Sequence, residues 1–158
     1  KGRIHPASEE WRMWLDKLNA GETDLTGANF VNAELTGIDF RGINLRNARF
    51  DGSKIVKCSF CMIDLKTGKR DPTRKGSLPE LEGATFWCAT LIDVDFALNV
   101  LKSVKFGDFL CGAILIRVSF IFATLNDVSF ECTTLEKVER RMAELIGSSA
   151  GGTHCTTR

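Results

Sequence analysis

The sequence has few of the residues that most often carry out catalysis. Its only two histidines, His5 and His154, lie near the ends of the chain and outside any repeated pattern. An enzyme needs a nucleophile, a base or a metal held in a concave site, and neither histidine provides a rigid anchor for one. The glycines are spread regularly and form no phosphate-binding loop between a strand and a helix. We therefore expect no catalytic residue, no cofactor and no metal site.

Net charge and long apolar runs are also lacking. The chain of 158 residues has 21 basic and 20 acidic side chains, a net charge of +1, so it has no strong field of either sign and we do not expect a nucleic acid as its partner. The longest apolar stretches, such as Ile114 to Ile116, are far shorter than the ~20 residues that cross a bilayer. The hydrophobic content of 44% is typical of one folded domain.

The chain contains instead a five-residue repeat. A helix places apolar residues three and four apart and a strand places them two apart, so a spacing of five fits neither element. We expect short sides joined by tight turns, with turn formers such as Gly27 and Asn32 between the inward residues. Such units bury little alone and are stable only when stacked. The large apolar positions are Leu25, Phe30, Leu35, Phe40, Leu45, Phe50, Ile55, Phe60 and Leu65.

A small or β-branched residue stands two positions before most of these centres, as in Ala28-Asn29-Phe30, Ala33-Glu34-Leu35 and Ala48-Arg49-Phe50, and the pattern returns from Ala84 to Leu135. It resembles the pentapeptide-repeat family, whose motif is A-(D/N)-L-x-x. The resemblance implies an all-β solenoid over residues 23–135. This would be a right-handed quadrilateral β-helix of about five coils, four repeats to a coil.

Two breaks interrupt the repeat. Residues 66–80 contain glycines and prolines and are predicted to form a loop insertion, with Leu81 rejoining the stack. Phe106 and Leu115 are nine residues apart, which two arrangements explain. Either Asp108-Phe109-Leu110 is a repeat with one residue deleted, which would place Leu110 beside Leu115, or Gly107 to Leu110 is a four-residue bulge within one repeat. The bulge preserves the alternation of Leu and Phe, so we favour it.

Helices are expected at both ends of the solenoid. In the N-terminal segment, residues 1–22, Ser8 is a good N-cap and Gly21 a good stop for a capping helix. A second helix is predicted over residues 136–147, where it would cap the last coil or pair with a second copy of the chain. Residues 148–158 read as a flexible tail. The apolar stripes of the two helices are Trp11, Trp14, Leu15 and Leu18, and Val138, Met142, Leu145 and Ile146.

The six cysteines are scattered, at positions 58, 61, 88, 111, 132 and 155, which favours free thiols and a reducing compartment such as the cytoplasm. Cys58 and Cys61 have a C-x-x-C spacing, but the repeat turns Cys58 inward and Cys61 outward, so we do not expect a functional pair. Cys111 and Cys132 fall on neighbouring coils, where a disulfide between them is an open alternative.

A rigid rod without catalytic groups is suited to binding, so the predicted function is a non-catalytic protein-interaction or scaffold module. The insertion is locally basic and would favour an acidic partner. Trp87 follows the centre Phe86 and should face outward beside the return of the insertion, where it would cover the base of the insertion or anchor a partner. The candidate partner-binding residues are Lys66, Lys69, Arg70, Arg74, Lys75 and Trp87.

The resemblance implies two further possibilities. Some family members are bacterial resistance proteins that bind DNA gyrase or topoisomerase IV by imitating DNA, but the stretch from Gly83 to Leu135 has only a slight acidic excess. Others lie in the thylakoid lumen. The chain begins with Lys1 rather than Met, which is compatible with a cleaved transit peptide, and six cysteines are compatible with an oxidising lumen.

Overall fold

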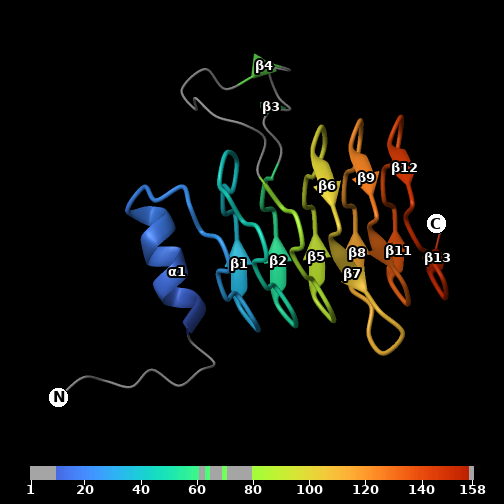
Figure 1. The fold of residues 1–158 in the computed structure, drawn as a ribbon, viewed down its shortest axis with the longest axis horizontal. Helices are drawn as coiled ribbons and strands as arrows, with labels where there is room; N and C mark the ends of the chain where they lie inside the picture. Colours follow the sequence, from blue (N-terminus) through green and yellow to red (C-terminus); the bar gives the residue numbers. More distant parts are fainter. Residues whose placement is uncertain (1–9, 61–62, 65–68, 71–79, 157–158) are drawn as a thin grey trace.

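The computed structural model describes residues 10–60, 63–64, 69–70 and 80–156. Helix α1 (Glu10–Asn19) comes first, and short parallel strands follow it. Six of the strands form one sheet that runs along the molecule, as Figure 1 shows. In order they are β1 (Glu34–Thr36), β2 (Lys54–Val56), β5 (Thr90–Ile92), β8 (Ile114–Ile116), β11 (Thr134–Glu136) and β13 (His154–Thr156).

The remaining parallel strands form the other walls. A three-stranded sheet contains β6 (Val100–Lys102), β9 (Thr124–Asn126) and β12 (Glu144–Ile146), and β7 (Lys105–Gly107) pairs with β10 (Ser129–Phe130). Leu35 pairs with Ile55, 20 residues later. Because each repeat has five residues, this register gives a coil of four sides. We name the sides after their first centres: Leu25, Phe30, Leu35 and Phe40. The predicted four-sided β-helix is confirmed.

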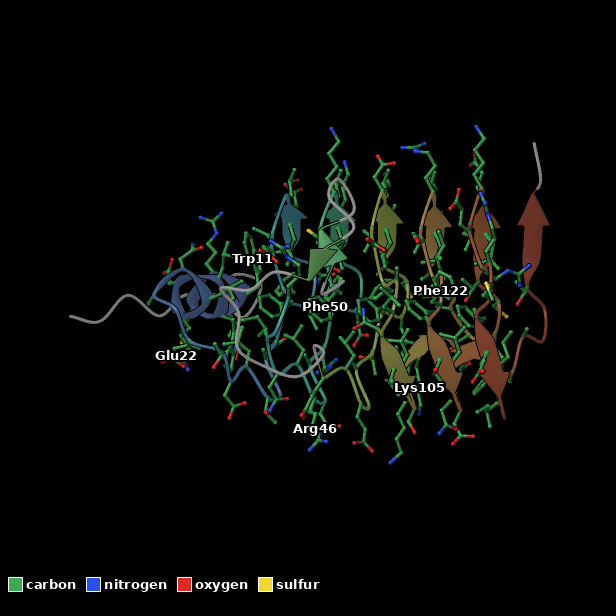
Figure 2. The ribbon with its side chains drawn as sticks, turned by 90° about the horizontal axis from the view of Figure 1, so that it is seen from above. Trp11, Glu22, Arg46, Phe50, Lys105 and Phe122 are labelled. Carbon is green, nitrogen blue, oxygen red and sulfur yellow. A yellow bond between two sulfur atoms is a disulfide. The ribbon has the colours of Figure 1, made fainter. Side chains whose placement is uncertain are left out.

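The core is a column of the predicted centres. All the Phe centres from Phe30 to Phe120 are fully buried, and they alternate with buried Leu and Ile. Rings one coil apart stack, as Phe30 and Phe50 do at 5.0 Å, whereas rings on opposite sides meet edge to face, as Phe30 and Phe40 do at 5.8 Å. In Figure 2, Phe50 lies within the stack while Arg46 points outward. The five-residue period thus produces two continuous ladders of phenylalanine.

Each corner of the coil is a tight turn with one residue in the left-handed region. Gly27, Asn32, Gly37 and Gly42 have φ between 57° and 71° in successive turns, again five residues apart. A turn with a positive φ at its third residue favours Gly or Asn there, because other side chains crowd the backbone. The turn formers in the sequence therefore mark the corners.

Helix α1 covers the first coil, as predicted. Trp11, Trp14 and Leu18 pack against the core. The helix ends in a Schellman motif, in which the Gly21 N–H donates to the Leu18 carbonyl at 3.0 Å and the Glu22 N–H to the Lys17 carbonyl at 3.1 Å. The proposed N-cap, Ser8, lies outside the described residues. No helix in the described part of the chain has the length and apolar character that crossing a membrane would require.

The predicted C-terminal helix over residues 136–147 is wrong, because the solenoid continues there. Strand β12 pairs with β9, with Leu145 opposite Leu125. The Glu144 N–H donates to the Ala123 carbonyl at 3.0 Å, so the backbone is satisfied by the coil below. The apolar spacing of Val138, Met142 and Leu145 imitates a helical stripe, but Ala143-Glu144-Leu145 is itself a repeat triplet. Long-range pairing therefore prevails over local periodicity.

Two other C-terminal predictions change with it. The segment read as a flexible tail contains β13, which pairs with β11, and Ser149 bridges to Ser129. The expected homodimer through a C-terminal helix loses its basis, since residues 136–147 contain strand and turn. Because the last coil has no coil above its Leu25 side among the described residues, Leu145 is 56% exposed although it occupies a core position.

The first break is larger than predicted. Ile63 and Leu65 were expected to continue the repeat, but β3 (Ile63–Asp64) pairs antiparallel with β4 (Lys69–Arg70) and forms a ribbon outside the stack (Figure 1). Leu81 takes the place in the stack that the register assigns to Leu65. The Leu45 N–H donates to the Glu80 carbonyl at 2.8 Å, and Leu81 is fully buried, so its predicted return to the stack is confirmed.

Candidate protein-interaction surface

The second break is a bulge, as favoured from the sequence. The Ala113 N–H donates to the Phe106 carbonyl at 2.7 Å, the same contact that joins Ala33 to Phe30 at 3.1 Å in a regular turn. Leu115 is fully buried, whereas Leu110 is 78% exposed and is not a repeat centre. We call the segment Gly107–Gly112 the projection. Figure 1 shows it as a loop on the edge of the stack opposite β3 and β4.

The base of the projection is held tightly. Gly107 and Gly112 form an antiparallel bridge, and the Ser129 hydroxyl donates to the Gly107 carbonyl at 2.7 Å. A side chain on Gly107 would collide with the Glu131 carbonyl, and one on Gly112 would collide with the Cys132 carbonyl. Only glycine fits at both positions, because the next coil rests directly on them.

The tip of the projection is ordered by one carboxylate and one disulfide. The Asp108 Oδ1 accepts the N–H groups of Leu110 at 2.8 Å and Cys111 at 3.0 Å, and these bonds hold the pKa of Asp108 below its ordinary value. A disulfide joins Cys111 to Cys88 in the coil below. Phe109, like Leu110, is left 78% exposed. The projection therefore presents two apolar side chains on a fixed backbone.

Trp87 lies beside the projection and not, as predicted, beside the insertion. The insertion leaves and rejoins at the corner between the Phe40 and Leu25 sides. Trp87 ends the Phe30 side, at the opposite corner, because the seven residues after Glu80 carry the chain across two sides, those with the centres Leu81 and Phe86. The Trp87 N–H donates to Asp51 Oδ1 at 3.1 Å, and Lys105 Nζ lies 5.8 Å from the indole centroid. The ring is half-buried.

Trp87 also contributes an unusual polar group. Its Nε1 is buried and has no hydrogen-bond acceptor among the described residues. A buried donor without a partner costs about 1–3 kcal/mol, and Nε1 of Trp14 is buried without a partner in the same way. The neighbouring residue is Cys88, so the indole and the disulfide anchor share one corner.

The basic residues of the insertion stay a prediction. Lys66, Arg74 and Lys75 lie outside the described residues. Lys69 and Arg70 form β4, opposite Asp64 and Ile63 in the ribbon. Strand β4, which contains Lys69 and Arg70, lies on the edge of the stack opposite the projection (Figure 1), and therefore away from the corner of Trp87.

A second apolar feature was missed in the sequence. Leu98, Phe122 and Met142 occupy the left-handed position of successive turns at the corner between the Phe40 and Leu25 sides, with φ of 60°, 55° and 55°. Phe122 is 51% exposed and Met142 74% exposed. We call these three residues the apolar corner. The signal was available, because large apolar residues stand where the other turns have small or polar residues.

Several charges on the walls are paired with opposite charges. Arg46 reaches Glu80 at 2.8 Å and Glu82 at 3.5 Å, and Lys102 meets Glu82 at 2.7 Å, which lowers the pKa of Glu82. Asp93 accepts two bonds from Arg117, at 2.5 and 2.9 Å, and its pKa is lowered by them. Exposed pairs of this kind contribute little to stability, because solvent screens their charges. They leave a surface of mixed charge.

The cysteines depart from the expectation of free thiols. Cys111 bonds to Cys88 and not to Cys132, which is free and exposed. Cys58 is buried in an inward position as predicted, and burial raises the pKa of its thiol. Cys61 lies outside the described residues. Among the described residues, no three His, Cys, Asp or Glu side chains gather as a metal site would require.

Comparison with known proteins identifies the fold. Residues 17–61 match the family model of pentapeptide repeats, in eight copies. None of the curated proteins matches the chain in sequence. The solved pentapeptide-repeat protein Rfr23 from the cyanobacterium Cyanothece 51142 is similar with a TM-score of 0.69 at 16% identity, over 90% of this chain and 97% of that one.

Two further solved structures align less closely. HetL, a pentapeptide-repeat protein involved in heterocyst differentiation regulation in the cyanobacterium Nostoc, has a TM-score of 0.46 at 14% identity, covering 89% of this chain and 92% of that one. QnrB1, a plasmid-mediated fluoroquinolone resistance protein, has a TM-score of 0.44 at 14% identity, covering 82% and 71%. Residues 17–61 thus carry pentapeptide repeats, and the chain has the fold of the pentapeptide-repeat protein Rfr23.

Proposed function

We propose that the protein is a non-catalytic module that binds another protein through the projection, with Trp87 at its base. One observation carries the proposal: Phe109 and Leu110 are each 78% exposed on a backbone that is fixed at both ends. Protein interfaces draw most of their energy from a few aromatic and apolar anchors that enter pockets on the partner. An anchor that is already ordered loses little entropy on binding.

The surroundings of the projection favour a protein over a nucleic acid. Asp108 carries a negative charge at the tip. The basic side chain over the Trp87 ring is Lys105. A nucleic-acid surface needs several unpaired basic side chains to neutralise phosphates. The net charge of +1 and the paired charges on the walls do not supply them.

The test replaces the two apolar side chains at the tip with polar ones, and compares this variant with a control in which an exposed apolar side chain is replaced elsewhere. In the double variant Phe109→Ser/Leu110→Ser the tip becomes polar, while Phe122→Asn removes an exposed ring from the apolar corner. Each protein is immobilised and used to capture proteins from an extract of the organism that makes it, with quantitative mass spectrometry. We expect the double variant to lose a partner, about tenfold or more, that Phe122→Asn retains. Equal recovery by all three proteins contradicts the proposal.

We propose the insertion as a second binding surface, for an acidic partner. The supporting observation is that β4 places Lys69 and Arg70 on a ribbon outside the stack. Deleting residues 64–79, which keeps Glu80 in the stack and restores the five-residue spacing, and repeating the capture separates the two surfaces. Loss of acidic partners on deletion supports the insertion. A partner list unchanged by the deletion leaves the projection as the sole candidate of the two.

Gyrase binding by DNA mimicry is a less favoured proposal, because the mixed charges do not form the anionic surface that mimicry requires. Inhibition of gyrase supercoiling at micromolar protein would revive it. The disulfide supports an oxidising compartment such as the thylakoid lumen over the cytoplasm. Titration of the native protein should find at most four free thiols, the six cysteines less the two in the disulfide. A count of six supports a reducing compartment.

A further inference from the structure

Three cysteines gather at the corner between the Phe30 and Leu35 sides. Cys88, Gly112 and Cys132 are the corner residues of successive coils, since the strands that follow them pair in register: Thr90 with Ile114 and Ile114 with Thr134. Cys111 immediately precedes Gly112. A side chain on Gly112 would strike the Cys132 carbonyl, so the Cys132 backbone lies directly over this position.

Cys111 therefore lies between the coil of Cys88 and the coil of Cys132. Its Cα is 5.4 Å from that of Cys88 in the disulfide. Stacked strands are about 4.8 Å apart, which falls within the Cα separations of ~4.4–6.8 Å that a disulfide spans. Cys88 and Cys132 are two coils apart, roughly 9.6 Å, and cannot bond to each other without unstacking the coils. Cys111 has two possible partners, one on each side.

We propose that this corner is a thiol–disulfide exchange site in which the bond of Cys111 moves between Cys88 and Cys132. Cys132 loses its proton to solvent, and the thiolate attacks the Sγ of Cys111. A bond forms between these two sulfurs as the bond to Cys88 breaks, and Cys88 leaves as a thiolate that takes up a proton. The number of disulfides is unchanged, so the step needs no oxidant or reductant.

The surroundings of Cys132 permit this step. Its thiol is free and exposed. Its Sγ leans toward the next coil, where it lies 3.5 Å from the position a side chain on Gly152 would take, so the glycine keeps this space open. Attack on Cys111 requires rotation about the Cys132 Cα–Cβ bond, which exposed side chains complete in picoseconds to nanoseconds.

The exchange changes how the projection is held. In one state Cys111 is bonded to the coil below, and in the other to the coil above. Phe109 and Leu110 are two residues and one residue away from it, so the apolar tip is drawn toward a different coil in each state. This inference concerns the cysteines alone and stands whether or not the projection binds a protein.

Trypsin places the three cysteines on separate peptides, residues 76–102, 106–117 and 118–137, so each disulfide gives a distinct cross-linked mass. The variant Cys88→Ser is refolded in a buffer of reduced and oxidised glutathione, alkylated and digested. We expect a link between the peptides of Cys111 and Cys132 in most molecules. Alkylated Cys132 with Cys111 free or bound to glutathione overturns the proposal.

The wild-type protein provides a second measurement that does not depend on a variant folding. After equilibration in the same buffer, we expect links from Cys111 both to Cys88 and to Cys132, and the variant Cys132→Ser should retain only the first. A wild-type protein with the Cys88 link alone, and Cys132 fully alkylated, overturns the exchange. A link between Cys88 and Cys132 also overturns it, because the stacked coils forbid that bond.

Discussion

At the scale of the residue, Asn99 stands where the repeat usually has alanine, and its side chain donates to a backbone carbonyl that the regular coil would otherwise satisfy. Asn99 takes an inward small position and is 1% exposed. Its Nδ2 donates to the Phe60 carbonyl at 2.9 Å and to the Phe96 carbonyl at 3.1 Å. Phe60 is the last centre before the insertion, so Asn99 satisfies the backbone where the regular coil is interrupted. A buried amide in a core position is thus explained by the break beside it.

Replacing this amide should be costly. Asn99→Ala restores the usual small residue but removes both bonds, and we expect a loss of about 1–3 kcal/mol in the free energy of unfolding by urea. The control is Ser53→Ala, since the Ser53 hydroxyl donates to the Phe50 carbonyl at 2.6 Å while the Ser53 N–H donates to the same carbonyl at 3.1 Å. That carbonyl keeps a partner, so a loss of ~1 kcal/mol or less is expected. Equal losses would refute the explanation.

Phe122 should be a site where stability can be gained. Its φ of 55° is unfavourable for a bulky L-residue by about 1–2 kcal/mol, and Asn tolerates this conformation better. Phe122→Asn should therefore raise the free energy of unfolding by ~0.5–1 kcal/mol, because a ring that is 51% exposed contributes little packing. Phe122→Val, which is β-branched, should lower it. If Asn proves more destabilising than Val, the ring packs more than its exposure indicates.

At the scale of the element, the backbone at the tip of the projection is ordered in part by one charge, the carboxylate of Asp108. Asp108 has a folded pKa below its ordinary value because its carboxylate accepts two N–H groups. Its stabilising effect is present above the unfolded pKa of 3.8 and is lost as the pH falls through the lower folded pKa. The amide NMR shifts of Leu110 and Cys111 should titrate with a midpoint below 3.8.

The variant Asp108→Asn serves as the control for this titration. It retains an acceptor oxygen without the charge, so the two amides should show no titration in the same range. A wild-type midpoint at or above 3.8 would mean that the carboxylate does not bind these amides in solution.

Elements also show the limit of local patterns. The bulge was predictable because its two readings give different centres, and alternation of Leu and Phe distinguishes them. The continuation of the solenoid through residues 136–147 was not predictable, because the spacing of Val138, Met142 and Leu145 fits both a helical stripe and the five-residue repeat. The pairing of β12 with β9 decides between the two, and it depends on residues 20 positions away. The position of Trp87 likewise could not be predicted from a local pattern, because it depends on the path of the chain around two sides of the coil.

At the scale of the whole molecule, the core is continuous through both breaks. Phe50 stacks on Phe86 at 4.8 Å and Phe60 on Phe96 at 4.7 Å, so the ladders pass the insertion without a gap. Stability of a stacked solenoid depends on contacts between neighbouring coils, and these contacts are formed on either side of the insertion. The insertion therefore adds little to the stability of the fold.

This continuity predicts the result of excision. Deleting residues 64–79 joins Ile63 to Glu80, which restores the five-residue spacing, with Ile63 at the small position and Leu81 at the centre. We expect a folded protein whose midpoint of thermal unfolding is equal to or higher than that of the wild type, because a long loop no longer has to be closed. Calorimetry and β-type circular dichroism measure it. A fall of more than about 5 °C would indicate that the insertion supports the stack.

The five-residue period by itself determined the inward residues and the corners, and the apolar stripe near the N-terminus determined the first helix, because each depends on residues that are close in sequence. Only the tertiary structure decided which coil lies beside which. It replaced Leu65 by Leu81, turned residues 136–147 into another coil, and brought Cys88 and Cys111 together. The physical reason is that the repeat shows which residues are buried but not which residues they contact. In a solenoid each residue contacts the residue one full coil away, so insertions in between change the sequence distance between contacting residues.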